Sequence, residues 1–305
     1  YRGYDSTGIA GIAEKGRLVC FKEAGKISHL KKKIPLQELA VAIGHTRWAT
    51  HGKVSHDNAH PHFDASGSLA VVHNGIIVNY RSLREELKRE GISFVSETDS
   101  EVIAQLIGFH FRGDLCEAVQ KTLPLLQGTF AIALIHKDCP HQIVAAARES
   151  PLAIGYDEGQ TESIISSDPN TFLGRMFNIL FLQNDEIASV EKGKITVFDR
   201  SLRPLAKKLE RFEADYQVPS KEGFAHFMLK EIYEQPLSIE KAMSGRCHTH
   251  FEPFGVTEEE IRAFRNIWIL GCGTSAHAGS IGAIYFEELA KIPTSCEIAS
   301  EARYR

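Results

Sequence analysis

The chain has 305 residues, of which 43% are hydrophobic and 24% charged, and its formal net charge is -4. These proportions are typical of a globular protein of about two domains and exclude a disordered or fibrous chain. The small negative charge gives no general attraction to nucleic acid or anionic membranes, and no apolar run approaches the ~20 residues of a membrane-spanning helix. We therefore expect neither nucleic acid nor a membrane among its partners.

The two ends of the chain predict whether it is a fragment, and its cysteines predict its cellular compartment. It starts at Tyr1 without an initiator Met or a signal peptide and stops at Arg305 inside a helical pattern, so we expect a piece of a longer protein. No CxxC pair occurs, which argues against a zinc ribbon or a disulfide scaffold and favours the cytoplasm. The six cysteines are Cys20, Cys116, Cys139, Cys247, Cys272 and Cys296.

Short apolar runs predict a series of strands in the first part of the chain, several of them buried on both faces. Helices are predicted over 79–90 and 102–111, the second opened by a Thr or Asp cap. Helices between runs of strands favour an α+β layered domain with packed sheets inside and helices outside. The predicted strands are 6–13, 40–44, 69–74, 129–136, 142–147, 163–167, 179–182 and 194–199.

The composition changes after Arg200. Residues 207–223 are polar and predict a linker, and residues 224–235 predict a helix that ends at Pro236. A further helix opens at Thr257, and a buried strand over 266–270 leads into a small-residue turn and a helix through Leu289. That order is the beginning of a parallel α/β domain. We expect a first domain over 1–212, a linker over 213–222 and a second domain over 223–305.

Three segments carry chemistry. Arg47 offers a planar fork for a carboxylate, with Trp48 beside it as a lid, although a surface Arg stacked on a Trp is the alternative. Asn74 and Gly75 form either a hairpin turn or two donors to an oxyanion. Asp99 is either a helix cap or the partner of an ammonium group. Together they suit free glutamine attacked at its side-chain amide, but no nucleophile accompanies them.

Longer strings resemble a known family. They begin with YRGYDSTGIA at residues 1–10 and continue with 44–52, His60-Pro61-His62, 72–75, Glu97-Thr98-Asp99, 226–236, 271–275 and 297–301. In order and over the whole chain, they resemble the glutamine–fructose-6-phosphate aminotransferases (isomerizing). The resemblance implies an N-terminal-nucleophile αββα glutaminase domain followed by the start of a sugar-isomerase (SIS) domain.

The resemblance also implies roles for particular residues. Arg47 and Asp99 would hold the carboxylate and amino groups of glutamine. Trp48 and His51, on the same loop as Arg47, would also belong to the glutamine-binding site, and this loop would gate ammonia transfer. Asn74 and Gly75 would form the oxyanion hole. Arg2 and Gly3 would support the N-terminus. Thr274 and Ser275 would touch the sugar phosphate.

The activity implied is the conversion of fructose 6-phosphate and glutamine to glucosamine 6-phosphate and glutamate, the first step of hexosamine biosynthesis. No cofactor is expected, and the full-length protein would be a homo-oligomer, a dimer. The family's nucleophile is an N-terminal cysteine upstream of Tyr1, so we expect this chain alone to be an inactive glutaminase.

Other interpretations remain. His60 and His62 could chelate a metal, but no carboxylate or cysteine completes a shell nearby, so no metal is expected. The turn at 271–275 lacks the third glycine of a dinucleotide loop. Another amidotransferase of the same glutaminase fold, such as amidophosphoribosyltransferase or asparagine synthetase, fits the first domain equally well but not the turn at 271–275. A non-catalytic module that binds glutamine or a sugar phosphate is the remaining alternative.

Overall fold

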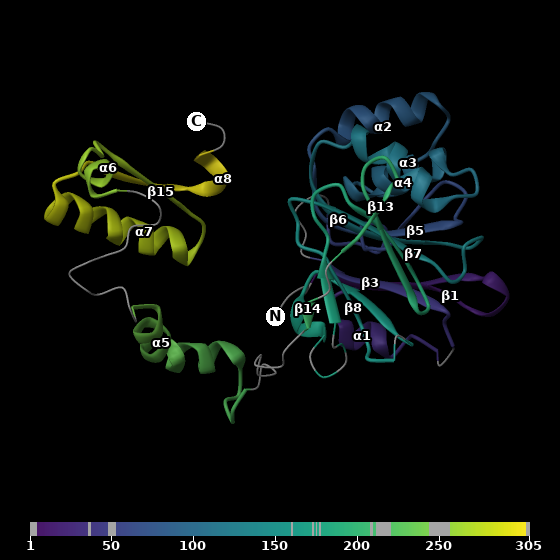
Figure 1. Ribbon diagram of the computed structural model, residues 1–305, viewed down its shortest axis with the longest axis horizontal. Coiled ribbons are helices and arrows are strands. Elements are labelled where there is room, and N and C mark those ends of the chain that lie inside the picture. The colour runs from purple at the N-terminus through teal and green to yellow at the C-terminus, as the bar shows by residue number, and fades with distance from the viewer. Residues whose placement is uncertain are drawn as a thin grey trace. The chain divides into compact units, whose positions relative to one another are not determined.

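The computed structural model describes residues 5–35, 38–47, 53–159, 161–172, 174, 176, 178–207, 210–211, 221–243 and 257–302. The chain divides into two compact units, Tyr1–Pro219 and Ser220–Arg305, and each is described by itself (Figure 1). Within the described ranges, every helix is too short or too polar to cross a bilayer.

An antiparallel sheet of seven strands forms the centre of the first unit, in the order β13-β12-β11-β7-β6-β5-β4. Its longest pair, β5 and β6, is in register from Leu69 opposite His136 to Ile77 opposite Gly128. The strands are β4 (His62–Phe63), β5 (Leu69–Ile77), β6 (Gly128–His136), β7 (Ile143–Arg148), β11 (Ile187–Glu191), β12 (Lys194–Phe198) and β13 (Pro204–Leu205).

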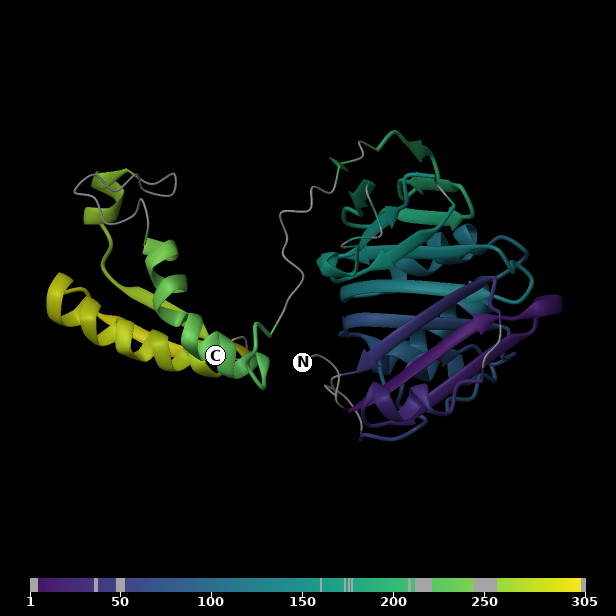
Figure 2. The same ribbon diagram turned by 90° about the horizontal axis from the view of Figure 1, so that it is seen from below.

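Two smaller antiparallel sheets make the second layer of this unit, with strand orders β2-β1-β3 and β14-β10-β8-β9. Figure 2 shows them stacked against the larger sheet. Their strands are β1 (Ser6–Ile12), β2 (Leu18–Ala24), β3 (Val41–Arg47), β8 (Ala153–Tyr156), β9 (Ser163–Ser166), β10 (Asn178–Phe181) and β14 (Glu210–Arg211).

Strand β6 is buried on both faces, which explains its unbroken apolar sequence. Phe130, Ile132 and Leu134 belong to the hydrophobic cluster under the helices, whereas Ala131 and Ile135 pack toward the other sheets. Alternate side chains of a strand point to opposite faces, so a strand between two layers needs apolar residues throughout. The prediction that this strand is covered on both sides is confirmed.

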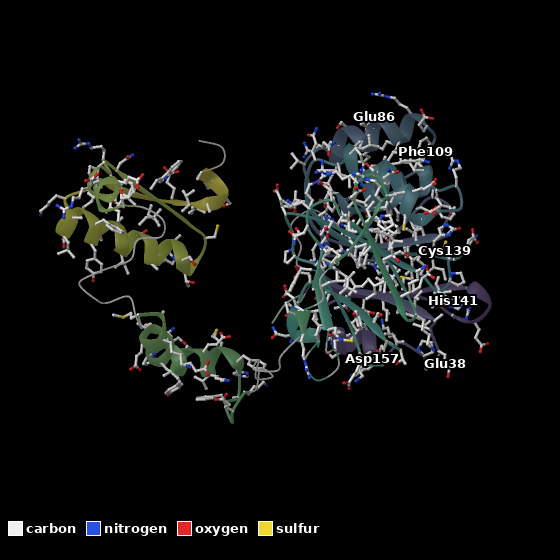
Figure 3. The ribbon with its side chains drawn as sticks, in the orientation of Figure 1. Glu38, Glu86, Phe109, Cys139, His141 and Asp157 are labelled. Atoms are coloured by element: carbon white, nitrogen blue, oxygen red, sulfur yellow. The ribbon has the colours of Figure 1, made fainter. Side chains whose placement is uncertain are left out.

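Helices close the two outer faces of the layered unit (Figure 1). On α2, Leu83 and Leu87 are buried, while Glu86 points outward (Figure 3). The helices are α1 (Ile27–Lys31) beside β1 and β2, and α2 (Tyr80–Arg89), α3 (Ser100–His110) and α4 (Leu115–Thr122) over the larger sheet. Short 3-10 turns occupy Glu14–Gly16, Leu123–Leu125 and Pro169–Phe172. The predicted helix–sheet–sheet–helix layering is thus confirmed.

The second unit holds a pair of parallel strands, β15 (Ile267–Gly271) and β16 (Thr294–Ile298), joined through α7 (Thr274–Tyr285). A Cβ on Gly279 of α7 would lie 2.7 Å from Cys296 Sγ and 2.8 Å from Ile269 Cγ2, so a larger residue would force these strand side chains to move. The predicted strand–turn–helix order of a parallel α/β domain is confirmed, but the strand is not buried as predicted, since Trp268 and Leu270 are 53% and 50% exposed. The remaining elements are α5 (Phe227–Met243), α6 (Glu258–Arg262), a π-helical turn (Phe286–Ala290) and α8 (Ala299–Ala302).

Several predicted elements need correction. All eight predicted strands occur, but the apolar pattern missed β2, β4, β8, β11, β13, β14, α1 and α4. Of these, β4, β13 and β14 have only two residues each. The helix predicted to end at Pro236 continues to Met243. A proline removes one N–H from the helix, and the following residues, among them Glu240, Lys241 and Ala242, are good helix formers that carry it on. The Thr257 cap on α6 is confirmed, with Glu260 completing a capping box.

Candidate functional site

A cavity of about 880 Å³ lies in the first unit, where β1, β3 and β5 meet the start of α3 and the segment after β9. Arg47, Asn74, Gly75 and Asp99 all line it. These residues come from three separate elements of the chain, and the cavity is within the size range of small-molecule sites. The structure therefore gathers four of the sequence-predicted site residues around one space.

Arg47 is the last residue of β3, and its side chain is only 4% exposed. Its Nη1 donates a hydrogen bond to the carbonyl oxygen of Lys53 at 3.2 Å. Burial lowers the pKa of the guanidinium, and the nearby carboxylates of Asp5 and Asp99 act in the opposite direction. With an ordinary pKa above 12, the group stays a cation at neutral pH.

Asp99 does not cap α3, although it immediately precedes the helix. It makes no side-chain hydrogen bond to the helix N-terminus. Its Oδ2 instead accepts a hydrogen bond of 2.8 Å from the backbone N–H of Ile77, at the end of β5. The capping interpretation of Asp99 is therefore wrong: the carboxylate lies against the strand that carries Asn74 and lines the cavity.

Asn74 and Gly75 do not form a hairpin turn. They lie inside β5, opposite Ala131 and Phe130 of β6. Gly75 has a φ of +129°, and a Cβ built on it would lie 2.1 Å from the carbonyl oxygen of Thr129. The turn interpretation fails because the strand pairing continues through both residues. Glycine is required here by the backbone conformation and by the approach of the neighbouring strand.

The Asn74 side chain is held at both ends. Its Oδ1 lies 2.8 Å from Nε2 of His45, and its Nδ2 donates to Oγ of Ser167 at 3.1 Å. Because Oδ1 is an acceptor, the His45 ring must carry its proton on Nε2. Sequence reasoning assigned no role to His45 or Ser167. His45 lies two residues before Arg47, but no local signal brings Ser167 into contact with Asn74.

Three more histidines, His60, His62 and His73, are buried beside the cavity. Burial lowers the pKa of each ring, that of His73 to about 4, so all three are neutral at pH 7. Neither ring nitrogen of His60 has a hydrogen-bond partner among the residues that the structure describes. Within the described part of the chain, no three His, Cys, Asp or Glu side chains are arranged to hold a metal.

The structure describes only two of the six other sequence-predicted site residues. Arg2, Gly3, Trp48 and His51 fall outside the described residues. Thr274 and Ser275 begin α7 in the second unit, after Gly273 at a φ of +56°. The backbone N–H of Ser275 donates to the carbonyl oxygen of Cys272 at 3.2 Å, inside the turn.

Comparison with known families finds two domains in this chain. The family described as glutamine amidotransferase domain matches residues 45–174, and the family described as SIS domain matches residues 260–305. The first match contains Arg47, Asn74, Gly75 and Asp99, and the second contains Thr274 and Ser275.

Curated relatives match the chain over 100% of its length. It is 41% identical to the glutamine–fructose-6-phosphate aminotransferase (isomerizing) of Caldanaerobacter subterraneus subsp. tengcongensis and covers 51% of that protein. It is 44% identical to the protein of the same name from Aquifex aeolicus and covers 50% of it. The chain thus spans about half the length of the curated relatives it matches.

Two solved structures share the fold. "Structure of the allosteric regulatory enzyme of purine biosynthesis" matches with a TM-score of 0.57 and 25% identity, over 66% of this chain and 44% of that chain. The glutamine phosphoribosylpyrophosphate amidotransferase from B. subtilis matches with a TM-score of 0.56 and 21% identity, over 97% of this chain and 60% of that one. The first unit accordingly has the glutaminase fold of the N-terminal-nucleophile amidotransferases, as predicted.

Proposed function

Because this chain is related along its whole length to the glutamine–fructose-6-phosphate aminotransferases, we propose that its first unit releases ammonia from glutamine for transfer to a sugar phosphate. The observation that carries this proposal is the gathering of Arg47, Asn74, Gly75 and Asp99 around one cavity. We place the glutaminase domain at 1–212, a linker at 213–222 and the SIS domain at 223–305.

A cation and an anion at this cavity suit the two charged groups of a free amino acid. The guanidinium of Arg47 can donate two parallel hydrogen bonds to the α-carboxylate. The carboxylate of Asp99 can receive the α-ammonium group. Asp99 already accepts one bond, from Ile77, but a carboxylate has about four lone-pair sites. A ligand that lacks either charge would gain an ionic contact with only one of these two groups.

The Asn74–Gly75 pair suits the oxyanion that forms when a nucleophile attacks the side-chain amide of glutamine. Asn74 contributes an NH₂ group, and Gly75 contributes a backbone N–H at a place where no Cβ intervenes. Donors fixed in advance toward developing negative charge lower the barrier of acyl transfer. In the related family the nucleophile is an N-terminal cysteine whose own α-amino group acts as the base.

The second unit would bind the acceptor of the ammonia. We assign Thr274 and Ser275, at the N-terminus of α7, to the phosphate of fructose 6-phosphate, since a helix N-terminus attracts anions. The complete reaction would yield glucosamine 6-phosphate and glutamate, without a cofactor. We further propose that the protein works as a homodimer in the cytoplasm.

The test is to supply the protein that contains this chain and its N-terminal cysteine with glutamine and fructose 6-phosphate. Glucosamine 6-phosphate should appear in step with glutamate. Glutamate release without any amino sugar would instead support a different amidotransferase. Glutamine binding without hydrolysis would support the binding-module alternative. The match of residues 260–305 to a SIS domain is the observation that favours a sugar acceptor over a phosphoribosyl one.

A further inference from the structure

Asn58 is a buried amide that joins two segments of the candidate site. Asn58 is only 2% exposed. Its Nδ2 donates to the carbonyl oxygen of Lys53 at 2.9 Å and to Oε2 of Glu97 at 3.2 Å. Its Oδ1 accepts from the backbone N–H of Glu97 at 2.8 Å. Both hydrogens and the oxygen of this carboxamide are therefore used.

Lys53 receives its position from the same contacts. Its N–H donates to Oε2 of Glu97 at 3.4 Å. Its carbonyl oxygen accepts hydrogen bonds from Nδ2 of Asn58 and, at 3.2 Å, from Nη1 of Arg47. An atom that accepts a hydrogen bond from the Arg47 guanidinium is thus itself held by Asn58.

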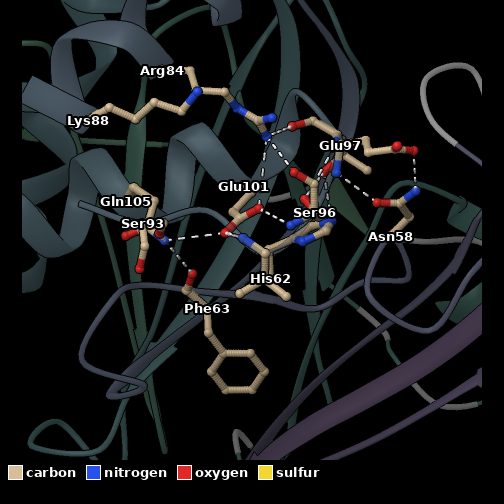
Figure 4. Close-up of polar contacts among 12 residues, drawn as sticks. Asn58, His62, Phe63, Arg84, Lys88, Ser93, Ser96, Glu97, Glu101 and Gln105 are labelled. Carbon is tan, nitrogen blue, oxygen red and sulfur yellow. Dashed lines mark hydrogen bonds and ion pairs between the residues drawn. The ribbon is translucent and has the colours of Figure 1, made fainter. Parts of the chain in front are cut away.

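The segment that carries Glu97 is firmly anchored, as Figure 4 shows. Arg84 donates to the carbonyl oxygens of Ser96 and Thr98 at 2.7 and 3.2 Å. The buried carboxylate of Glu101 accepts from the backbone N–H groups of Val95 and Ser96 at 2.8 and 2.6 Å. Two residues beyond Glu97, the same segment presents Asp99. Asn58 therefore fixes the Arg47 side of the cavity relative to the Asp99 side.

We propose that Asn58 is a positioning residue for recognition of the substrate carboxylate, acting through the Lys53 carbonyl on Arg47. This inference rests on the proposed glutamine site. A bidentate contact between guanidinium and carboxylate depends on the orientation of the fork, so a small rotation of Arg47 weakens binding. Asparagine suits the place because it donates twice and accepts once, whereas aspartate at neutral pH only accepts.

The test measures the dissociation constant of glutamine for the purified 305-residue chain by calorimetry, together with the melting temperature. Asn58→Asp removes both donated bonds and places a carboxylate against Glu97. We expect glutamine to bind at least fivefold more weakly and the melting temperature to fall. In an Arg47→Lys background, the same substitution should change the affinity less than twofold, because the fork on which Asn58 acts is already absent.

A charge-matched double variant separates positioning from general stability. Asn58→Asp with Glu97→Gln keeps the net charge and restores a donor and an acceptor between these two residues, but the Lys53 carbonyl still lacks its amide donor. We expect the melting temperature to recover and the glutamine affinity to stay low. Asn266→Asp, an exposed change of the same kind in the second unit, should alter neither value.

The outcomes distinguish the positioning role of Asn58 from the proposed glutamine site. If affinity recovers together with the melting temperature, or if Asn58→Asp weakens binding equally in the Arg47→Lys background, the positioning role is overturned. Normal affinity in a folded Asn58→Asp chain overturns it as well. Failure of the folded, unsubstituted chain to bind glutamine would instead overturn the proposed function, and this inference with it.

Discussion

Nε2 of His45 lies 2.8 Å from Oδ1 of Asn74 and fixes which end of the carboxamide faces the ring. With its oxygen turned to His45, Asn74 has its nitrogen near Ser167, at the wall of the cavity. Burial lowers the pKa of His45, so its ring is neutral at pH 7 and holds Asn74 through a single donated hydrogen bond. The orientation of the proposed oxyanion donor thus depends on a histidine from a neighbouring sheet.

Asn74→Asp should preserve the fold and abolish most of the glutaminase activity. Aspartate can accept from His45, as Asn74 does, and can accept from the hydroxyl of Ser167 in place of donating to it. The melting temperature should therefore hardly change. Loss of one oxyanion donor costs about 10²–10³ in kcat, and the added negative charge should increase that loss.

The measurement is glutamate release by the protein that contains this chain and its N-terminal cysteine, with isomerisation of the sugar as an internal control. Isomerisation should persist. Near-normal glutamine hydrolysis by a well-folded Asn74→Asp protein would remove Asn74 from the oxyanion site.

Gly75→Ala should destabilise the first unit more than Gly113→Ala does. Both glycines have a positive φ, +129° and +106°, so both substitutions carry strain of roughly 1–2 kcal/mol. Among the described atoms, the new Cβ at Gly75 would meet the Thr129 oxygen at 2.1 Å, whereas the new Cβ at Gly113 would have no neighbour within 4 Å. Forcing the strands apart adds about 1–3 kcal/mol. Urea unfolding of the two variants measures the difference, and equal losses would show that β6 moves aside without cost.

Arg47→Lys should raise KM for glutamine and leave kcat nearly unchanged. Lysine keeps the positive charge but loses the two-pronged match to a carboxylate, a difference of roughly 1–3 kcal/mol. Binding lost equally in the ground and transition states appears in KM alone. Steady-state kinetics decide the matter. A large fall in kcat at constant KM would transfer Arg47 from binding to chemistry.

The first unit should lose stability in mild acid. His60, His62 and His73 are buried with lowered pKa values, that of His73 being about 4, whereas an unfolded histidine titrates near 6.5. The unfolded chain therefore binds protons first as the pH falls. The contribution of these neutral histidines to the free energy of unfolding is fully present above about pH 6.5 and declines from there toward pH 4.

Melting temperatures between pH 7.5 and 5 measure this decline before most carboxylates titrate. His60→Leu offers a matched comparison, because within the described ranges neither ring nitrogen of His60 has a hydrogen-bond partner to lose. The variant should lose little stability at pH 7.5 and show a flatter decline. An equally steep decline in His60→Leu would place the acid-sensitive group elsewhere.

The layered fold could be predicted because the sequence patterns that specify it lie within single strands and helices. Alternation along the strands and the stripe of Leu83 and Leu87 on α2 follow directly from burial on one face or both. Judged by local sequence alone, the Asn74–Gly75 pair wrongly predicts a turn, because an Asn-Gly pair usually forms one. Only the long-range pairing of β5 with β6 over nine residues shows that the chain runs straight through it.

The candidate site was predictable in part. Arg47, Asn74, Gly75 and Asp99 were identified from their chemistry and from the resemblance, and the structure brings them together. Asn58 and Ser167 were not, because a small polar residue in a loop has no distinctive pattern. Ser167 lies 93 residues from Asn74 in the sequence, and only the stacking of two sheets makes them neighbours.

The hydrogen bond from Asn74 to Ser167 also affects how the Asn74 side chain would act in the proposed reaction. An amide nitrogen carries two hydrogens, so the bond to the Ser167 hydroxyl uses one of them and the other is left for a ligand. Because His45 contacts the oxygen and Ser167 the nitrogen, rotation of the carboxamide is already restricted in the folded protein. In the proposed site, the donor would therefore lose little further rotational freedom when the substrate amide is attacked.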